Sequence, residues 1–189
     1  MRTATGFTLI EILMALVVMA VLMSLAAPSL TKMVLDNRLR SQSADLMTNL
    51  AIARSEAAKR GVRVTVCAST TYASATPSCT GGGQTAWNQG YIVFADQNGD
   101  GAFTAGSDTV IKVSDPLAGG NTLATSGFNA PASADKLQYR PSGNTNLPAA
   151  GGFFRLCDNR AGATTGRQIQ IGISGRPVSV TPTTACPFP

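Results

Sequence analysis

The sequence lacks histidine altogether and has few charged or aromatic residues. Of its 189 residues, 13% are charged, 6% are aromatic and one is tryptophan. Histidine is the commonest general acid or base near neutral pH and the commonest metal ligand, so its absence argues against both kinds of site. No serine or cysteine has an evident neighbouring base, and no glycine motif that could cradle a phosphate opens a helix. We therefore expect a protein that is not an enzyme and that has no cofactor.

One long apolar run stands near the start of the chain. Between residues 7 and 27 the polar side chains are Thr8, Glu11 and Ser24. Twenty-odd residues at a helical rise of about 1.5 Å each span the hydrocarbon core of a membrane. A carboxylate raises the free energy of inserting such a segment into a membrane, so its presence there favours a functional role. Glu11 therefore predicts a partner for its charge.

Two simpler interpretations account for part of this pattern. In the first, the run is a secretory signal, because Arg2 supplies a short positive leader and residues 24–27 imitate a small-residue cleavage site. In the second, the run is a plain membrane anchor. The anchor explains the length of the run, but it leaves Glu11 and the short polar leader unexplained.

The residues Gly6-Phe7-Thr8-Leu9-Ile10-Glu11 resemble the processing motif of type IV prepilins and type II secretion pseudopilins. In that family a membrane peptidase cuts after the glycine and methylates the new amino terminus. The resemblance implies that a leader, residues 1–6, is removed and that Phe7 is methylated in the inner membrane. It also implies that the Glu11 carboxylate meets the terminal amine of a neighbouring subunit, which would neutralise a stranded charge.

The helical pattern continues beyond Pro28 and stops at Gly61. Apolar residues recur there at spacings of three, four or seven, which gives one stripe along a helix: Leu39, Leu46, Leu50, Ala53 and Ala57. Pro28 removes an internal hydrogen bond and should kink or loosen the helix. We predict a hydrophobic transmembrane or filament-core helix over 7–28, continued over 29–60 by an amphipathic helix that packs on a head domain.

The remaining residues, 61–189, predict a β-rich head. Seven short runs bounded by Gly, Pro, Ser or Asn favour strands at residues 63–67, 91–95, 109–113, 136–140, 153–157, 167–173 and 176–180. In one of these runs, Ile169, Ile171 and Ile173 alternate with Gln or Gly, which is the period of a half-buried strand. Residues 117–134 are rich in Gly, Ala, Ser and Asn and predict a loop. The expected fold class is α+β, with one long helix on antiparallel sheets.

Several head segments are similar to the FimT/FimU/GspH group of minor pilins and pseudopilins. The matching segments are 53–57, 60–64, 87–94 and 156–160. The resemblance implies a type IV pilin-like fold, a β-sandwich head in the periplasm and a single-pass anchor, followed by a periplasmic or extracellular pilus. It also implies a prepilin peptidase and other pilins as partners, in a role that initiates or caps pilus assembly. Two alternatives remain, namely a DNA-binding minor pilin for uptake in natural transformation and a type II secretion pseudopilin of the GspH type.

Four cysteines suggest oxidation after export. They allow three pairings, and the sequence alone does not choose among them. Pairing Cys67 with Cys79 would close a local loop, and pairing Cys157 with Cys186 would pin the C-terminal tail. We favour this combination, since its second bridge resembles the C-terminal disulfide loop common in pilins. Metal ligation by cysteine is disfavoured by the wide spacings and the absence of histidine.

The segment 96–101 resembles the first half of an EF-hand calcium loop. Asp96, Asn98 and Asp100 place oxygen ligands at alternate positions. The second half does not follow, because Ser107 stands where a bidentate glutamate is needed and Asp108 comes one residue late. A hairpin turn in which Asp and Asn bond their own backbone explains the same residues.

Basic residues predominate after residue 135. This part of the chain contains six basic residues and one acidic residue, Asp158. One interpretation is a surface that binds DNA electrostatically. The others are a solvated face and a contact for an acidic pilin. DNA-uptake members of the family carry a Gly-Arg-any-Arg element. Here residues 175–178 read Gly-Arg-Pro-Val, so Val178 replaces the second arginine. The DNA-binding candidates are Arg160, Arg167 and Arg176.

Overall fold

The computed structural model describes residues 6–80, 87–128, 135–160, 166–182 and 186, without the side chains of residues 26–28. The chain divides into two compact units, residues 1–38 and residues 39–189. One helix, α1 (Leu9–Arg60), contributes to both units and continues through Pro28 without interruption. The predicted leader, apart from Gly6, lies outside the described residues.

In the first unit, α1 begins with a capping box. Thr8 precedes the first helical residue, its hydroxyl accepts a hydrogen bond from the Glu11 backbone N–H at 3.3 Å, and Glu11 accepts from the Thr8 backbone N–H at 2.8 Å. Reciprocal bonds of this kind satisfy amide donors that have no partner inside the helix. The helix is long and apolar enough to cross a membrane.

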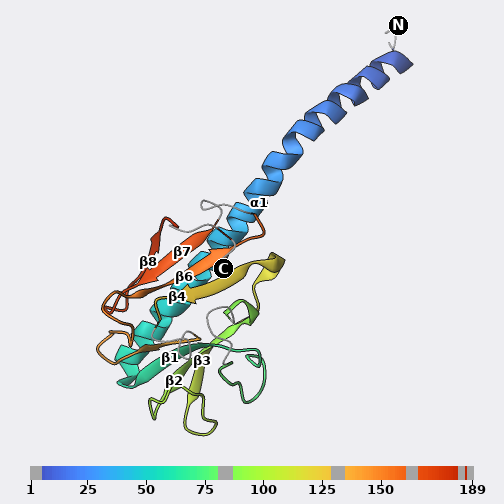
Figure 1. Cartoon of the computed structure of the whole chain (residues 1–189). Helices are drawn as coiled ribbons and strands as arrows, with labels where there is room; N and C mark the ends of the chain where they lie inside the picture. The colour runs from blue at the N-terminus through green and yellow to red at the C-terminus, as the bar shows by residue number, and fades with distance from the viewer. Residues whose placement is uncertain (1–5, 81–86, 129–134, 161–165, 183–185, 187–189) are drawn as a thin grey trace. The chain divides into compact units, whose positions relative to one another are not determined.

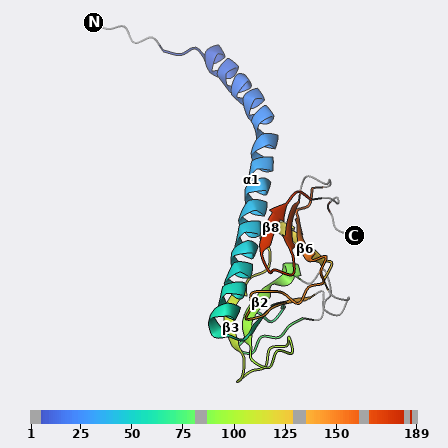
Figure 2. The same cartoon turned by 90° about the vertical axis from the view of Figure 1, so that its left-hand side faces the viewer.

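In the second unit, residues 39–60 of α1 pack with two four-stranded antiparallel sheets. The first sheet has the order β3 (Thr109–Ser114), β2 (Tyr91–Asp96), β1 (Arg63–Ala68) and β5 (Lys136–Tyr139). The second has the order β4 (Thr122–Ser126), β6 (Gly152–Cys157), β7 (Arg167–Ile171) and β8 (Pro177–Val180). Figures 1 and 2 show both sheets on the same side of this part of α1. The predicted α+β architecture is confirmed.

The predicted apolar stripe is the part of α1 that the sheets cover. Its five residues, Leu39, Leu46, Leu50, Ala53 and Ala57, are all at most 3% exposed. They join one core cluster with side chains of β1, β6 and β7. Trp87 is fully buried at the centre of this core, with its ring centroid 4.8 Å from that of Phe154 in an edge-to-face arrangement. Packing of α1 against the sheets thus follows from the period of its apolar residues.

The interpretation of residues 117–134 as a loop was wrong for part of that segment. It contains a short 3-10 turn, η2 (Ala118–Gly120), and then β4, which pairs with β6 from Thr122↔Cys157 to Ser126↔Phe153. Leu123 and Ala124 are buried at 2% and 3% exposure. Leu123 is the one large apolar residue of this strand, so β4 lacks the run of large apolar residues used to recognise the others. Residues 129–134 lie outside the described part of the chain.

The expected strand over 167–173 was too long at its C-terminal end. β7 stops at Ile171, and Ile173 is 53% exposed. The chain reverses immediately, since the Gly175 N–H donates to the Gly172 carbonyl at 2.9 Å. Ile169 and Ile171 are buried as expected, but the turn ends the alternation before Ile173.

Candidate functional site

The first candidate site is the start of α1. Gly6 and Phe7 precede the helix, Phe7 is 86% exposed, and a Cβ on Gly6 would meet nothing within 4 Å. The peptide bond between them therefore lies in an open, non-helical segment. Glu11 lies one turn further on, at the first turn of the helix.

The Glu11 carboxylate has a partner within its own chain. Oε2 accepts from the Thr8 backbone N–H and from the Thr8 hydroxyl, both at 2.8 Å. No hydrogen bond to Oε1 is recorded among the residues that the structure describes, so this oxygen can accept from a donor outside the chain. The spacing Thr-x-x-Glu is a recognised sequence signature of a capping box, and it could have identified Thr8 as a functional neighbour beforehand.

Behind Glu11 the helix is exposed on every face. Large apolar side chains there are about half exposed or more, including Leu13 at 48%, Met14 at 63% and Leu25 at 71%. Soluble monomers rarely leave so large a contiguous apolar surface uncovered. This part of α1 is suited to lipid or to the helices of other subunits.

Both favoured disulfides are present in the second unit. Cys67 is bonded to Cys79 with the Cα atoms 5.5 Å apart, and Cys157 to Cys186 with the Cα atoms 5.7 Å apart. Cys186, beyond the last strand, is 3% exposed. The second bridge therefore holds Cys186 next to the end of β6.

The calcium candidate is a hydrogen-bonded turn in this structure. Asp96 is 1% exposed, and its two carboxylate oxygens accept from the backbone N–H groups of Gly99 and Gly101, from the Thr65 hydroxyl and from the Gln138 amide, at 2.6 to 2.9 Å. Asn98 and Asp100 bond each other and the turn backbone instead of converging with Asp96. These bonds are the ones expected for a hairpin turn in which Asp and Asn side chains bond the nearby backbone.

Asp108 contributes to the same loop in a way that the sequence did not reveal. Its Oδ1 accepts from the Gln97 N–H at 3.0 Å, and its Oδ2 accepts from the Thr104 N–H at 2.7 Å. The carboxylate thus joins the two ends of the connection between β2 and β3. Within the described residues, no group of three or more Asp, Glu, Cys or His side chains is placed to hold a metal ion.

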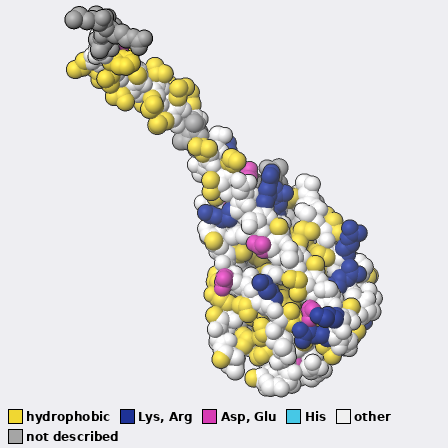
Figure 3. Space-filling view, turned by 180° about the vertical axis from the view of Figure 1, so that it is seen from behind, with side chains coloured by type: hydrophobic (Ala, Val, Ile, Leu, Met, Phe, Trp, Pro, Cys, Tyr) yellow, Lys and Arg dark blue, Asp and Glu magenta, His cyan; other side chains and the backbone are white. Residues whose placement is uncertain are grey.

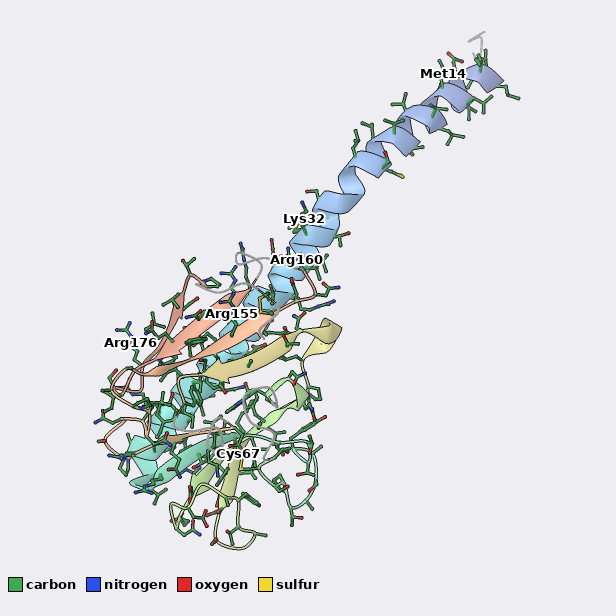
Figure 4. The ribbon with its side chains drawn as sticks, viewed as in Figure 1. Met14, Lys32, Cys67, Arg155, Arg160 and Arg176 are labelled. Atoms are coloured by element: carbon green, nitrogen blue, oxygen red, sulfur yellow. A yellow bond between two sulfur atoms is a disulfide. The ribbon has the colours of Figure 1, made fainter. Side chains whose placement is uncertain are left out.

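The DNA-binding candidates do not form one patch. Arg160 forms an ion pair with Asp158, at 2.6 Å from Nη2 to Oδ2. Arg167 begins β7, whereas Arg176 lies just before Pro177, which is opposite Ile171 at the other end of that strand. Four to five residues of strand separate them, which is about 15 Å. Figure 4 shows Arg160 and Arg176 in separate regions of the head, both outside the strands.

Arg155, one of the basic residues counted after residue 135, is not on the surface. Its side chain is fully buried, Nη1 donates to the Gln168 Oε1 atom at 3.3 Å, and Nη2 lies 3.9 Å from the Cys186 Sγ atom. Burial lowers the pKa of this guanidinium from its ordinary value, although an arginine remains charged at any physiological pH. Arg155 therefore belongs to the interior of the second sheet and cannot contribute to an exposed basic face.

Comparisons with known proteins agree with these features. The profile described as "Type II transport protein GspH" matches residues 42–181, and that described as "Prokaryotic N-terminal methylation motif" matches residues 1–27. A comparison with curated protein sequences gives no match.

Two crystal structures of the type IV minor pilin FimU from Pseudomonas aeruginosa strain PAO1 have a similar fold. The structure in space group P21 is 19% identical with a TM-score of 0.57, over 80% of this chain and 95% of the FimU chain. The structure in space group P65 is 18% identical with a TM-score of 0.54, over 79% and 98%. Because the GspH profile covers most of the chain and the methylation motif precedes it, the chain belongs to the GspH family of type IV minor pilins and pseudopilins.

Proposed function

We propose that this protein is a minor pilin that helps to initiate or cap a type IV pilus. The prepilin peptidase removes residues 1–6 and methylates Phe7, while α1 holds the protein in the inner membrane with the head in the periplasm. The observation that carries the proposal is the exposed apolar surface of α1 directly behind Glu11, in a chain that begins with a methylation motif. Such a surface is covered when helices of several subunits pack into a filament.

Glu11 directs this packing. Thr8 occupies Oε2 and holds the side chain at the first turn, while Oε1 remains able to accept. The methylated amine of Phe7 in a neighbouring subunit would meet that oxygen in an apolar environment. A carboxylate left without this partner would keep most of its desolvation cost. The axial position at which Glu11 meets the neighbouring amine is therefore favoured over other positions of the subunit along the filament.

The Glu11→Ala variant tests this role. We expect normal membrane insertion and a loss of about tenfold in the amount found in sheared filaments relative to the membrane fraction, since a charge pair of about 1.4 kcal/mol corresponds to that factor. The matched control is Ser24→Ala, which removes another polar group from the same apolar stretch; its hydroxyl bonds the Val21 carbonyl within the helix at 2.7 Å. Wild-type incorporation of the Glu11→Ala variant would contradict the proposal.

A deletion strain separates the pilus role from the alternatives. Loss of surface pili with normal protein secretion supports the pilus, whereas the reverse result supports a type II secretion pseudopilin. Loss of transformation with normal piliation would support the DNA-uptake alternative. That alternative has less support from the arrangement of the head, because its candidate arginines are dispersed.

A further inference from the structure

A groove of about 680 Å³ lies beside the exposed side of α1 in the second unit. Residues from one side of α1 line it together with the start of β8 and the turn after β5. The lining residues are Met47, Thr48, Ala51, Arg54, Ser55, Ala58, Ser142, Gly143, Arg176 and Pro177. The lining combines apolar side chains with polar and charged ones, as protein interfaces do.

Gly143 contacts both of the segments that carry the arginines of this groove. Arg54 donates from Nε to the Gly143 carbonyl at 3.2 Å. The same carbonyl lies against the backbone of Gly175, the residue before Arg176, with no room for a Cβ between them. Contacts at Gly143 therefore bring the half-buried Arg54 and the exposed Arg176 to the same groove from distant parts of the chain.

The groove is positively charged. Arg54 and Arg176 are its two charged lining residues, and no carboxylate is present among the described residues that line it. Glu56, on the neighbouring turn of α1, is already paired with Arg60 at 2.6 Å and with Lys59 at 3.5 Å. Figure 3 shows one face of the molecule, on which basic side chains (dark blue) and acidic side chains (magenta) are both interspersed with apolar surface.

The opposite flank of α1 carries a small net negative charge. A second hollow of about 460 Å³ lies there, and its charged lining residues are two exposed carboxylates, Asp45 and Asp115, and one exposed cation, Lys112, which leaves a net charge of −1. A subunit with a basic groove on one flank and acidic residues on the other can associate head to tail. Repetition of such a contact produces a helical filament instead of a closed oligomer.

We propose that the groove between α1 and β8 binds an acidic segment on the head of a neighbouring pilin subunit, with Arg54 and Arg176 pairing its carboxylates. This proposal rests on the proposed function in a filament. A protein segment fits the site better than DNA, because phosphate contacts need cations but make no use of the apolar lining residues Met47, Ala51 and Ala58.

The test uses the full-length protein in cells that assemble filaments. A photoreactive benzoylphenylalanine replaces Ser55, an exposed residue of the groove lining, and a control protein carries it at Ala102, at an exposed position in the loop between β2 and β3. After irradiation, mass spectrometry identifies the attached peptide. We expect an adduct from position 55 to a protein with an N-terminal methylation motif, at a peptide that contains Asp or Glu, and no such adduct from position 102.

Charge reversal then tests the pairing. Arg176→Glu should reduce the adduct by about fivefold, the upper range for an exposed ion pair, whereas Arg167→Glu at the other end of β7 should leave it unchanged. Adduct formation that ignores Arg176→Glu, or adducts only to DNA or lipid, would overturn the proposal. If the protein enters filaments and gives no adduct, the groove proposal fails alone. If wild-type protein never enters filaments, the proposed function fails as well.

Discussion

Gly175 lies directly against the carbonyl oxygen of Gly143, so the hairpin between β7 and β8 packs closely on the turn after β5. Gly175 also has a φ of +76°, and the ring of Tyr139 would lie 3.0 Å from a Cβ at this position. Both the backbone conformation and the space require glycine here. Arg176 and Pro177, which line the groove together with Gly143, follow directly after this position.

Gly175→Ala is expected to destabilise the second unit by about 2–5 kcal/mol. Left-handed backbone costs an alanine about 1–2 kcal/mol, and overpacking adds about 1–3 kcal/mol. Unfolding of the full-length protein in detergent can be followed by the fluorescence of Trp87, the one tryptophan, which is fully buried. The control is Gly106→Ala, where φ is +92° but a Cβ would meet nothing within 4 Å. Equal effects of the two substitutions would contradict the tight contact at Gly143.

Asp96→Asn should cost about 2–4 kcal/mol, because an amide nitrogen would face donors that now bond a buried carboxylate. Asp100→Asn, at an exposed position in the same turn, should cost about 1 kcal/mol or less. Thermal unfolding of both variants measures the difference. Calcium is expected to leave the wild-type midpoint unchanged, since the Asp96 oxygens are already occupied by internal donors. A calcium-dependent rise that Asp96→Asn abolishes would instead support the metal site.

Deprotonation of Tyr91 is expected to lower the free energy of unfolding of the second unit at alkaline pH. Burial raises the pKa of its phenol above the ordinary value of 10.0, opposed by hydrogen bonds with Ser114 and Asn49. The unfolded chain then loses this proton first as the pH rises, so the stabilising contribution is complete below pH 10 and declines above it. Tyr91→Phe should be less stable than wild type at pH 8, through loss of the Asn49 hydrogen bond, but should show a smaller further decline above pH 10. Parallel pH profiles of the two proteins would exclude this role.

The sequence predicted elements whose apolar residues are large and periodic. The helical stripe ending at Ala57 and the strand containing Ile169 are examples, because burial of one face requires that period. It failed for β4, which has one large apolar residue. It also failed for Arg155, whose burial depends on Gln168 and Cys186 from other segments. The groove could not be predicted from the sequence for the same reason, since the contact of Gly143 with Gly175 joins separate loops.

The two disulfides should contribute unequally to stability. Cys157 and Cys186 are 29 residues apart, and Cys67 and Cys79 are 12 apart. The chain-entropy model gives about 3.5 kcal/mol for the longer loop and about 3 kcal/mol for the shorter one. Replacing Cys157 and Cys186 together with serine should also expose the surroundings of Arg155, which adds to the loss. Denaturant unfolding of the two double variants compares them, and a larger loss for the Cys67 and Cys79 variant would contradict this order.

Val178 is the position that most directly tests a DNA-binding surface on this scaffold. It lies in the edge strand β8, is 46% exposed, and stands two residues after Arg176. Val178→Arg would place a second cation beside the first, so duplex DNA affinity of the full-length protein in detergent should rise about tenfold at moderate salt. The slope of log affinity against log salt should steepen by about one, as expected for one added phosphate contact. Val178→Lys is expected to act similarly. Val178→Gln, which adds length without charge, should leave the affinity unchanged. An increase with glutamine, or none with arginine, would show that the missing cation is not what limits DNA binding here.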